Sequence, residues 1–153
     1  MQQKLGAIKS DSNGMKVLIY TDGAARGNPG PSASGYRIYG HGRKVLHETE
    51  VYNGIKTNNF AEYNSVILAL EWCAAHLAAK DIDVEVDSDS QIVVHQMSGN
   101  YKVKAEGLKP LHERCKELCR KFKSVTFKNL PREHTGIREV DRRLNLLLDR
   151  MGK

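Results

Sequence analysis

The stretch Met15-Lys16-Val17-Leu18-Ile19-Tyr20-Thr21-Asp22-Gly23 decides the fold class of this chain. Residues 15–20 form a short, nearly continuous apolar run, which is typical of a β-strand buried on both faces of a sheet. An acidic residue, Asp22, ends this run. An acid directly after a buried apolar strand usually has a specific task. The stretch therefore predicts a buried strand with a functional carboxylate at its end.

The residues that follow predict two further strands. Residues 23–35 contain Gly27-Asn28-Pro29-Gly30-Pro31, a composition that predicts a tight loop rather than regular structure. Residues 36–39 and 44–52 are expected to be strands joined as a hairpin across Gly40-His41-Gly42. The first three strands should therefore form an antiparallel meander.

The remainder of the chain alternates between helical and strand patterns. Asn58 or Asn59 is expected to cap a long helix that reaches about Lys80, because apolar residues recur there at helical spacing. Alternation of apolar and acidic residues predicts a fourth strand at 82–87. A short helix at 90–97, a helix at 111–122, a strand at 124–130 and a helix at 139–151 complete the order βββαβααβα. A strand–helix–strand unit favours a parallel pair beside the meander, so the fold class is α/β.

Length and composition indicate one soluble globular domain. The chain has 153 residues, of which 40% are hydrophobic and 27% charged. Its longest apolar runs fall well short of the ~20 residues that span a membrane. Residues 1–14 lack the apolar stretch of a signal peptide, so we expect a polar N-terminal extension followed by a folded domain at 15–153. The three cysteines lack a Cys-x-x-Cys pair, which favours reduced thiols in a cytoplasmic protein.

The charge balance favours a polyanionic partner. Lys and Arg number 24 against 18 Asp and Glu, which gives a net charge of +6. Gathering several acids into one site would leave the rest of the surface still more basic. Nucleic acid is the first candidate, although a solvated lysine-rich face would give the same balance.

Four acids stand where predicted elements begin or end: Asp22, Glu62, Asp89 and Asp141. Asp22 and Asp89 follow two strands that, if parallel neighbours, expose both side chains at one edge of the sheet. Glu62 and Asp141 are expected in the first turns of their helices, which can point to the same edge. Gathered carboxylates repel each other unless they hold cations, and their hard oxygens suit two Mg²⁺ or Mn²⁺ ions. Such a pair of ions can promote phosphodiester hydrolysis.

Each acid also has a structural explanation. Glu62 and Asp141 could complement the dipoles of their helices, and Asp89 could cap the helix that starts near Ser90. Taken singly, these explanations compete with metal binding. All four acids together, in this order of elements, favour the metal site.

The motifs together resemble those of the type 1 ribonuclease H family over about residues 15–151. They are Thr21-Asp22-Gly23-Ala24 with Gly27-Asn28-Pro29-Gly30, Thr57-Asn58-Asn59 with Ala61-Glu62, Asp89-Ser90, and Asp141 with Leu144-Asn145. The resemblance implies a ribonuclease H-like fold, a mixed five-stranded sheet of order 3-2-1-4-5 with helices on both faces. It also implies an endonuclease that hydrolyses the RNA strand of RNA/DNA hybrids with two metal ions, leaving 5′-phosphate and 3′-hydroxyl ends.

The resemblance assigns roles residue by residue. Asp22, Glu62, Asp89 and Asp141 match the family's metal-binding acids, which implies two Mg²⁺ ions with Mn²⁺ as a substitute. Asn28 and Asn58 match positions that contact the minor groove and ribose hydroxyls, and Thr57 matches one that helps hold a DNA-strand phosphate. The resemblance also implies substrate contacts at Gly23 and Asn59. The expected partner is the hybrid duplex, bound by a monomer.

The chain departs from the family pattern near its end. Many members carry a catalytic histidine ten residues before the last aspartate, whereas His134 precedes Asp141 by seven. A shorter subtype has Pro-Arg-Glu here and no catalytic histidine, and Pro131-Arg132-Glu133 matches it. His134 is therefore either a catalytic residue or an exposed loop histidine.

A second departure is the segment from Gly99 to Pro110, which resembles the short form without a full basic protrusion. Lys102 and Lys104 are expected to follow a nucleic-acid backbone, although a solvated loop is the alternative. His95 falls where related enzymes often carry Asn, so it could face substrate or simply solvent.

Other functions share parts of this pattern. A hybrid-binding module without catalysis would be expected to lack one of the four acids. A 3′→5′ proofreading exonuclease would carry Asp-x-Glu on the first strand, whereas Asp22 is followed by Gly23 and Ala24. An actin-like ATPase would need a much longer chain.

Overall fold

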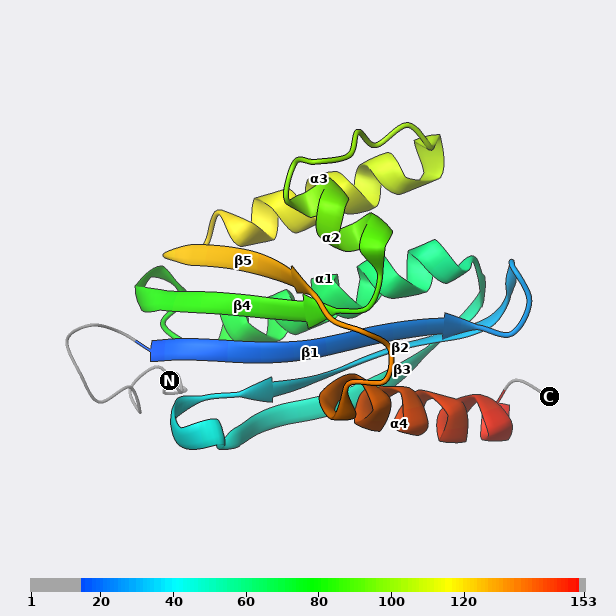
Figure 1. Ribbon diagram of the computed structural model, residues 1–153, viewed down its shortest axis with the longest axis horizontal. Coiled ribbons are helices and arrows are strands. Elements are labelled where there is room, and N and C mark those ends of the chain that lie inside the picture. The colour runs from blue at the N-terminus through cyan, green and yellow to red at the C-terminus, as the bar shows by residue number, and fades with distance from the viewer. Residues whose placement is uncertain (1–14, 152–153) are drawn as a thin grey trace.

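The computed structural model describes residues 15–151 (Figure 1). The strands are β1 (Met15–Ala25), β2 (Gly30–Tyr39), β3 (Val45–Lys56), β4 (Ile82–Ser88) and β5 (Ser124–Asn129). The helices are α1 (Asn58–His76), α2 (Gln91–Met97), α3 (Lys109–Cys119) and α4 (Thr135–Met151), with 3-10 turns at His41–Arg43, Ala79–Asp81 and Glu106–Leu108. The predicted order of strands and α-helices is confirmed. The expected extension at 1–14 lies outside the described residues.

The five strands form one mixed sheet in the order β3-β2-β1-β4-β5. β1 pairs antiparallel with β2, and β2 pairs antiparallel with β3, which is the predicted meander. β4 lies parallel to both β1 and β5. The strand order implied by the sequence resemblance is confirmed. The strand after α1 thus returns beside β1, as a strand–helix–strand unit requires.

Helices cover both faces of this sheet because successive side chains of β1 point to opposite sides. Val17 and Ile19 lie on the face of the sheet that α1 covers, and they are fully buried in the larger apolar cluster. Tyr20 faces α4 and belongs to a second cluster with Ile137 and Leu144. In Figure 1, α1 lies behind the sheet and α4 in front of it. The predicted arrangement of helices is therefore confirmed.

The loop between the first two strands is much shorter than predicted. β1 continues to Ala25 and β2 begins at Gly30, so the irregular residues are 26–29 rather than 23–35. The pairing runs on from Asp22 opposite Gly35 to Ala25 opposite Ser32. Pro31 has no N–H to donate, but its carbonyl accepts a hydrogen bond of 2.8 Å from the Arg26 N–H. A proline therefore fits at position 31, because the Arg26 N–H opposite it needs only a carbonyl acceptor.

The helix boundaries also correct the predictions. Thr57, not Asn58 or Asn59, caps α1, because its hydroxyl accepts from the Phe60 N–H at 3.1 Å. The helix ends at His76, before the predicted Lys80.

α4 begins at Thr135, four residues earlier than predicted. Glu62 and Asp141 consequently lie beyond the first turns of their helices, where a helix dipole has little effect on them. Interaction with the helix dipoles therefore explains these two acids less well than metal binding does.

Within residues 15–151, none of the helices combines the length and apolar character needed to cross a membrane. The three cysteines are free thiols. Burial raises the pKa of the Cys73 thiol to about 12, so this thiol stays protonated at neutral pH.

Candidate active site

The parallel register of β1 and β4 brings two acids to one level. Tyr20 lies opposite Asp87 in this pair, and Asp22 and Asp89 each follow two residues later. Asp22 stands within β1 rather than at its end, which corrects the prediction, because β1 runs three residues further beside β2. Asp89 follows the last residue of β4. Both acids therefore lie at the carboxyl ends of the paired segments, where open α/β sheets bind ligands.

Glu62 reaches the same edge because α1 packs very closely on β1. A Cβ atom on Gly23 would lie 2.3 Å from the Ala61 carbonyl carbon and 2.4 Å from the Glu62 nitrogen, so only glycine fits. The Gly23 N–H donates to Glu62 Oε1 at 3.0 Å. The Ser34 hydroxyl donates to the Ala61 carbonyl at 2.7 Å. Gly23, expected to bind substrate, thus contacts the carboxylate of Glu62 directly.

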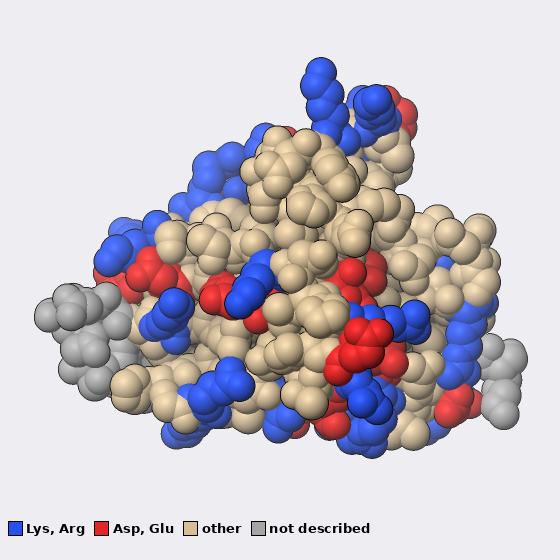
Figure 2. Space-filling model, in the orientation of Figure 1, with Lys and Arg blue, Asp and Glu red and all other residues tan. Residues whose placement is uncertain are grey.

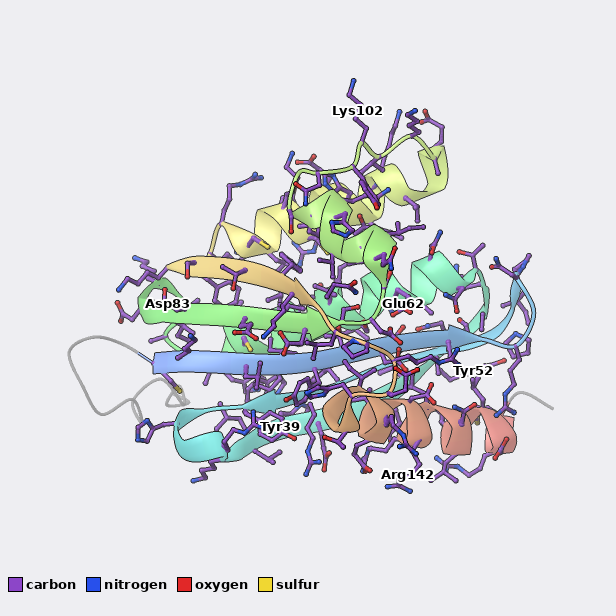
Figure 3. The ribbon with its side chains drawn as sticks, in the orientation of Figure 1. Tyr39, Tyr52, Glu62, Asp83, Lys102 and Arg142 are labelled. Carbon is purple, nitrogen blue, oxygen red and sulfur yellow. The ribbon has the colours of Figure 1, made fainter. Side chains whose placement is uncertain are left out.

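The acids gather in a cleft of about 850 Å³. Carboxylate oxygens of Asp22, Glu62 and Asp89 lie within 4.8 Å of one another. Asp141, from α4, lines the same cleft outside this tight trio. Figure 2 shows acidic side chains near the centre of the viewed face, with Lys and Arg around them, and Figure 3 labels Glu62. The structure thus brings all four predicted acids to one cleft.

The electrostatics of the trio are unfavourable without a cation. Asp22 and Glu62 are only 4% and 7% exposed. Burial raises the pKa of Asp22 well above its ordinary value, and the charges of Glu62 and Asp89 raise it further. Burial likewise raises the pKa of Glu62, and Asp89 adds to this effect. The pKa of Asp89 is raised by burial, while a hydrogen bond with Asp22 and the charge of Arg132 oppose that shift.

The donor set fits a divalent cation. Asp89 Oδ1 is buried without a hydrogen-bond partner among the described residues. A partnerless buried oxygen beside two other carboxylates is costly unless a positive charge compensates for it. Carboxylate oxygens are the ligands that Mg²⁺ and Mn²⁺ prefer. The residues therefore suit such an ion in both charge and chemistry.

The predicted asparagine and threonine positions form a unit beside the cleft. Asn28 Oδ1 accepts a hydrogen bond of 2.9 Å from the Asn58 N–H, which ties the Gly-Asn-Pro-Gly loop to the start of α1. Asn58 lines the acidic cleft. Asn28, Thr57 and Asn59 line a neighbouring hollow of about 470 Å³. The loop and the helix start thus offer polar groups on a path that leads into the acidic cleft.

His134 lies at the start of α4. Its Nδ1 accepts from the Gly136 N–H at 3.1 Å, and its carbonyl accepts from the Arg138 N–H at 2.9 Å. Its ring centroid lies 5.3 Å from that of Tyr20. The cleft is lined by Arg132 from the same segment and not by His134. His134 is therefore a half-buried helix cap, not the freely exposed loop residue considered as the alternative to catalysis.

The remaining predicted contacts lie apart from the acids. His95 is on α2, where its ring contacts Tyr101 at a centroid distance of 4.7 Å, and it does not line the cleft. Lys102 lines a separate hollow of about 570 Å³ between α2 and α3. Lys104 is exposed in the same segment. The segment from Gly99 to Leu108 projects from the rest of the molecule, and Figure 3 shows Lys102 at its tip, away from Glu62.

The cleft residues to which the sequence analysis assigned no site role include Arg26, Arg132 and Asn145. Arg132 follows β5, which is parallel to β4, so its segment leaves the sheet at the acidic edge. Its charge lowers the pKa of Glu62 and of Asp89, in opposition to burial. The position of Arg132 could have been inferred from the sequence. A basic residue shortly after β5, which is parallel to β4, emerges at the same edge of the sheet as the acids.

Sheet order and acidic cleft together define a class: an α/β domain of ribonuclease H-like fold with carboxylates at the carboxyl edge of β1 and β4. Solved structures share this architecture. The N-terminal RNase H domain of Rv2228c from Mycobacterium tuberculosis is 35% identical, with a TM-score of 0.81 over 89% of this chain and 95% of that one. LC11-RNase H1, solved in complex with an RNA/DNA hybrid, is 38% identical, with a TM-score of 0.80 over 88% of this chain and 97% of that one.

Sequence comparison gives the family. The family model for RNase H matches residues 14–143. The "Bifunctional protein Rv2228c" of Mycobacterium tuberculosis is 39% identical over 119 residues, which are 77% of this chain and 32% of that protein. "Ribonuclease HI" of Halobacterium salinarum is 35% identical over 129 residues, which are 82% of this chain and 62% of that protein. The chain thus spans less than two thirds of either relative. It belongs to the RNase H family, and the resemblance found in the sequence is confirmed.

Proposed function

We propose that this protein is an endonuclease that hydrolyses the RNA strand of RNA/DNA hybrids and leaves 5′-phosphate and 3′-hydroxyl ends. The observation that carries the proposal is the trio of Asp22, Glu62 and Asp89, whose oxygens lie within 4.8 Å of one another in an open cleft. Family membership supports the same activity. So does the relative that was solved with an RNA/DNA hybrid.

The proposed cofactor is a pair of Mg²⁺ ions, for which Mn²⁺ can substitute, held by Asp22, Glu62, Asp89 and Asp141. When bound, such ions supply activation of the attacking water and charge compensation at the leaving oxygen. The protein itself supplies fixed ligands. The Gly23 N–H orients the Glu62 carboxylate, and burial in the packed edge of the sheet limits movement of Asp22. Holding these groups in place before substrate arrives lowers the entropic cost of the reaction.

Selectivity for the RNA strand is proposed to depend on the Asn28–Asn58 unit. A ribose 2′-hydroxyl is both a donor and an acceptor, so fixed polar groups beside the cleft can distinguish it from deoxyribose. The hydrogen bond between Asn28 Oδ1 and the Asn58 N–H holds the loop against α1. Thr57 and Asn59 line the adjoining hollow, which supports a contact with a backbone phosphate of the other strand.

His134 has two proposed roles that differ in their consequences. Its Nδ1 accepts a hydrogen bond from the Gly136 N–H, which supports a role in stabilising the first turn of α4. A role in proton transfer or product release stays a prediction. Cytoplasmic location and a monomeric state likewise stay predictions.

One cleavage experiment tests the proposal. Labelled RNA/DNA hybrid, duplex RNA, duplex DNA and a duplex with a single ribonucleotide are incubated with Mg²⁺ or with Mn²⁺. We expect cuts in the RNA strand of the hybrid, with 5′-phosphate ends, and no cuts in the presence of EDTA. Hybrid binding without cleavage under all of these conditions would contradict the proposal and favour a binding module.

A further inference from the structure

Asp141 differs from the other three acids in how it is held. Asp22 and Asp89 belong to the sheet edge, and Glu62 is fixed by the Gly23 N–H. Asp141 comes from α4 and is only half-buried. Its carboxylate is held instead by Asn145, one turn later on the same helix. The Asn145 Nδ2 group donates to Asp141 Oδ2 at 3.2 Å and to the Asp141 carbonyl at 3.0 Å.

A second residue fixes the orientation of the Asn145 amide. Arg26 Nη2 donates to Asn145 Oδ1 at 3.1 Å and to the Asn145 carbonyl at 3.2 Å. Because a guanidinium has donors and no acceptor, it selects the orientation with the amide oxygen toward Arg26. The amide NH₂ group must then face Asp141. Arg26 is itself held by an ion pair of 2.8 Å with Asp149 and by its backbone bond to Pro31.

The chain of contacts connects two parts of the site. Arg26 directly precedes the Gly-Asn-Pro-Gly loop, and Asn145 and Asp141 lie on α4. Arg26, Asn145 and Asp141 all line the acidic cleft. The hydrogen bond from Asn145 to Oδ2 restrains the Asp141 carboxylate at the wall of that cleft. Hydrogen bonds to a metal-coordinating side chain orient it and thereby affect how tightly the metal is bound.

We propose that Arg26 and Asn145 are positioning residues that orient Asp141 for the divalent cation. The inference rests on the proposed function, because it assigns Asp141 to the metal. Arg26 acts through Asn145 and not on the metal directly. The two residues therefore form one unit, and loss of either should have the same consequence as loss of both.

The test compares Arg26→Gln, Asn145→Ala and the double variant. Mn²⁺ affinity is measured by calorimetry on the free protein, without substrate, and kcat and KM for the hybrid are measured separately. We expect each single variant to weaken Mn²⁺ binding and lower kcat by about tenfold at limiting metal, with little change in KM. The double variant should bind Mn²⁺ no more weakly than the single variant with the lower affinity, because Arg26 acts through Asn145. Arg26→Lys, which keeps one donor, should restore part of the affinity.

The matched control is Arg150→Gln, which also removes a positive charge but from an exposed position near the end of α4. It should bind Mn²⁺ as the wild type does. Melting temperatures in EDTA show whether each variant is folded, and alanine at position 145 suits a helix. Wild-type Mn²⁺ affinity in Asn145→Ala, additive losses in the double variant, or an equal loss in Arg150→Gln would overturn the inference.

These results are distinguishable from failure of the proposed function. If the wild type cleaves hybrid while Arg26→Gln and Asn145→Ala bind Mn²⁺ normally, only the positioning role is wrong. If the wild type binds Mn²⁺ and both variants weaken it, but no hybrid is cut, the positioning role stands and the proposed activity is wrong.

Discussion

The acidic cleft and the projecting segment from Gly99 to Leu108 show two ways of building a functional surface. In the cleft, Glu62 is held by packed backbone: Gly23 has no room for a Cβ atom, and its N–H donates to the Glu62 carboxylate. In the projecting segment, lysines lie on exposed backbone, and a Cβ atom on Gly107 would meet nothing within 4 Å. Chemistry requires atoms fixed to fractions of an ångström, whereas attraction to a phosphate backbone requires only charge at roughly the right distance.

The largest effect is expected for Asp22→Asn in the cleft. Removing one carboxylate charge from the buried trio should abolish Mg²⁺-dependent cleavage of the hybrid, because an amide is a much weaker ligand for a hard cation. The fold should persist, since the substitution also removes repulsion from Glu62 and Asp89. Cleavage assays and the melting temperature in EDTA check both statements. Undiminished cleavage would refute the role assigned to Asp22.

Gly23→Ala tests whether close packing fixes the cleft. The new Cβ atom would meet the Ala61 and Glu62 backbone at 2.3–2.4 Å, so α1 must move away from β1. We expect a loss of about 1–3 kcal/mol in unfolding free energy and about a hundredfold loss in kcat. Gly107→Ala is the control, and it should leave both quantities unchanged. Equal effects of the two substitutions would mean that the contrast between the regions is wrong.

Stability of the metal-free protein should fall as pH rises. The pKa values of Asp22 and Glu62 are raised in the folded state from ordinary values of 3.8 and 4.5. The folded state therefore binds more protons than the unfolded chain above those ordinary values, and its stability declines as pH increases. Melting temperatures in EDTA should drop from pH 5 to pH 8, less steeply in Asp22→Asn. Excess Mg²⁺ should restore the melting temperature at pH 8. A melting temperature that does not change with pH in EDTA would contradict the raised pKa values of these two acids.

His134 can be tested with two substitutions that separate its roles. Asn accepts hydrogen bonds well at a helix start, so His134→Asn keeps the cap and removes the imidazole. His134→Ala removes both, which should cost about 1 kcal/mol of stability. If the imidazole transfers a proton, both variants should lower turnover by roughly tenfold to a hundredfold. Unchanged turnover in both would assign this chain to the histidine-independent subtype.

The smallest effect is expected in the projecting segment. Lys102→Ala with Lys104→Ala should weaken hybrid binding mainly at low salt and leave kcat unchanged. The slope of log affinity against log salt should fall by about 1 for each lysine that contacts a phosphate. Lys80→Ala with Lys121→Ala, at exposed positions away from the cleft, is the control. A kcat defect in the first pair would mean that the segment does more than attract substrate.

Much of the fold could be predicted because its patterns are local. The apolar run of β1 and the alternation of β4 identified their strands, and the order of elements implied the parallel pair. The extent of β1 and β2 could not be predicted, because it depends on pairing between Ala25 and Ser32 and on the acceptor role of Pro31. Glycine and proline statistics describe single residues and not their partners across a sheet.

The four acids were predictable from the order of strands and helices, although only Asp89 lies directly at the end of an element. Their supporting contacts were not. Arg26 lies 119 residues from Asn145, and nothing in the local sequence connects them. The cap at His134 was also missed, because the helix was expected to begin four residues later. Long-range side-chain contacts and the exact ends of strands and helices are therefore what the sequence did not provide.

The most direct test of the proposed metal site is anomalous diffraction from crystals soaked in Mn²⁺, alone and with bound hybrid. We expect strong anomalous density between the carboxylates of Asp22, Glu62 and Asp89, with Asp141 in contact when hybrid is present. No density at that position, in crystals that otherwise hold the hybrid in the cleft, would contradict the proposed metal site.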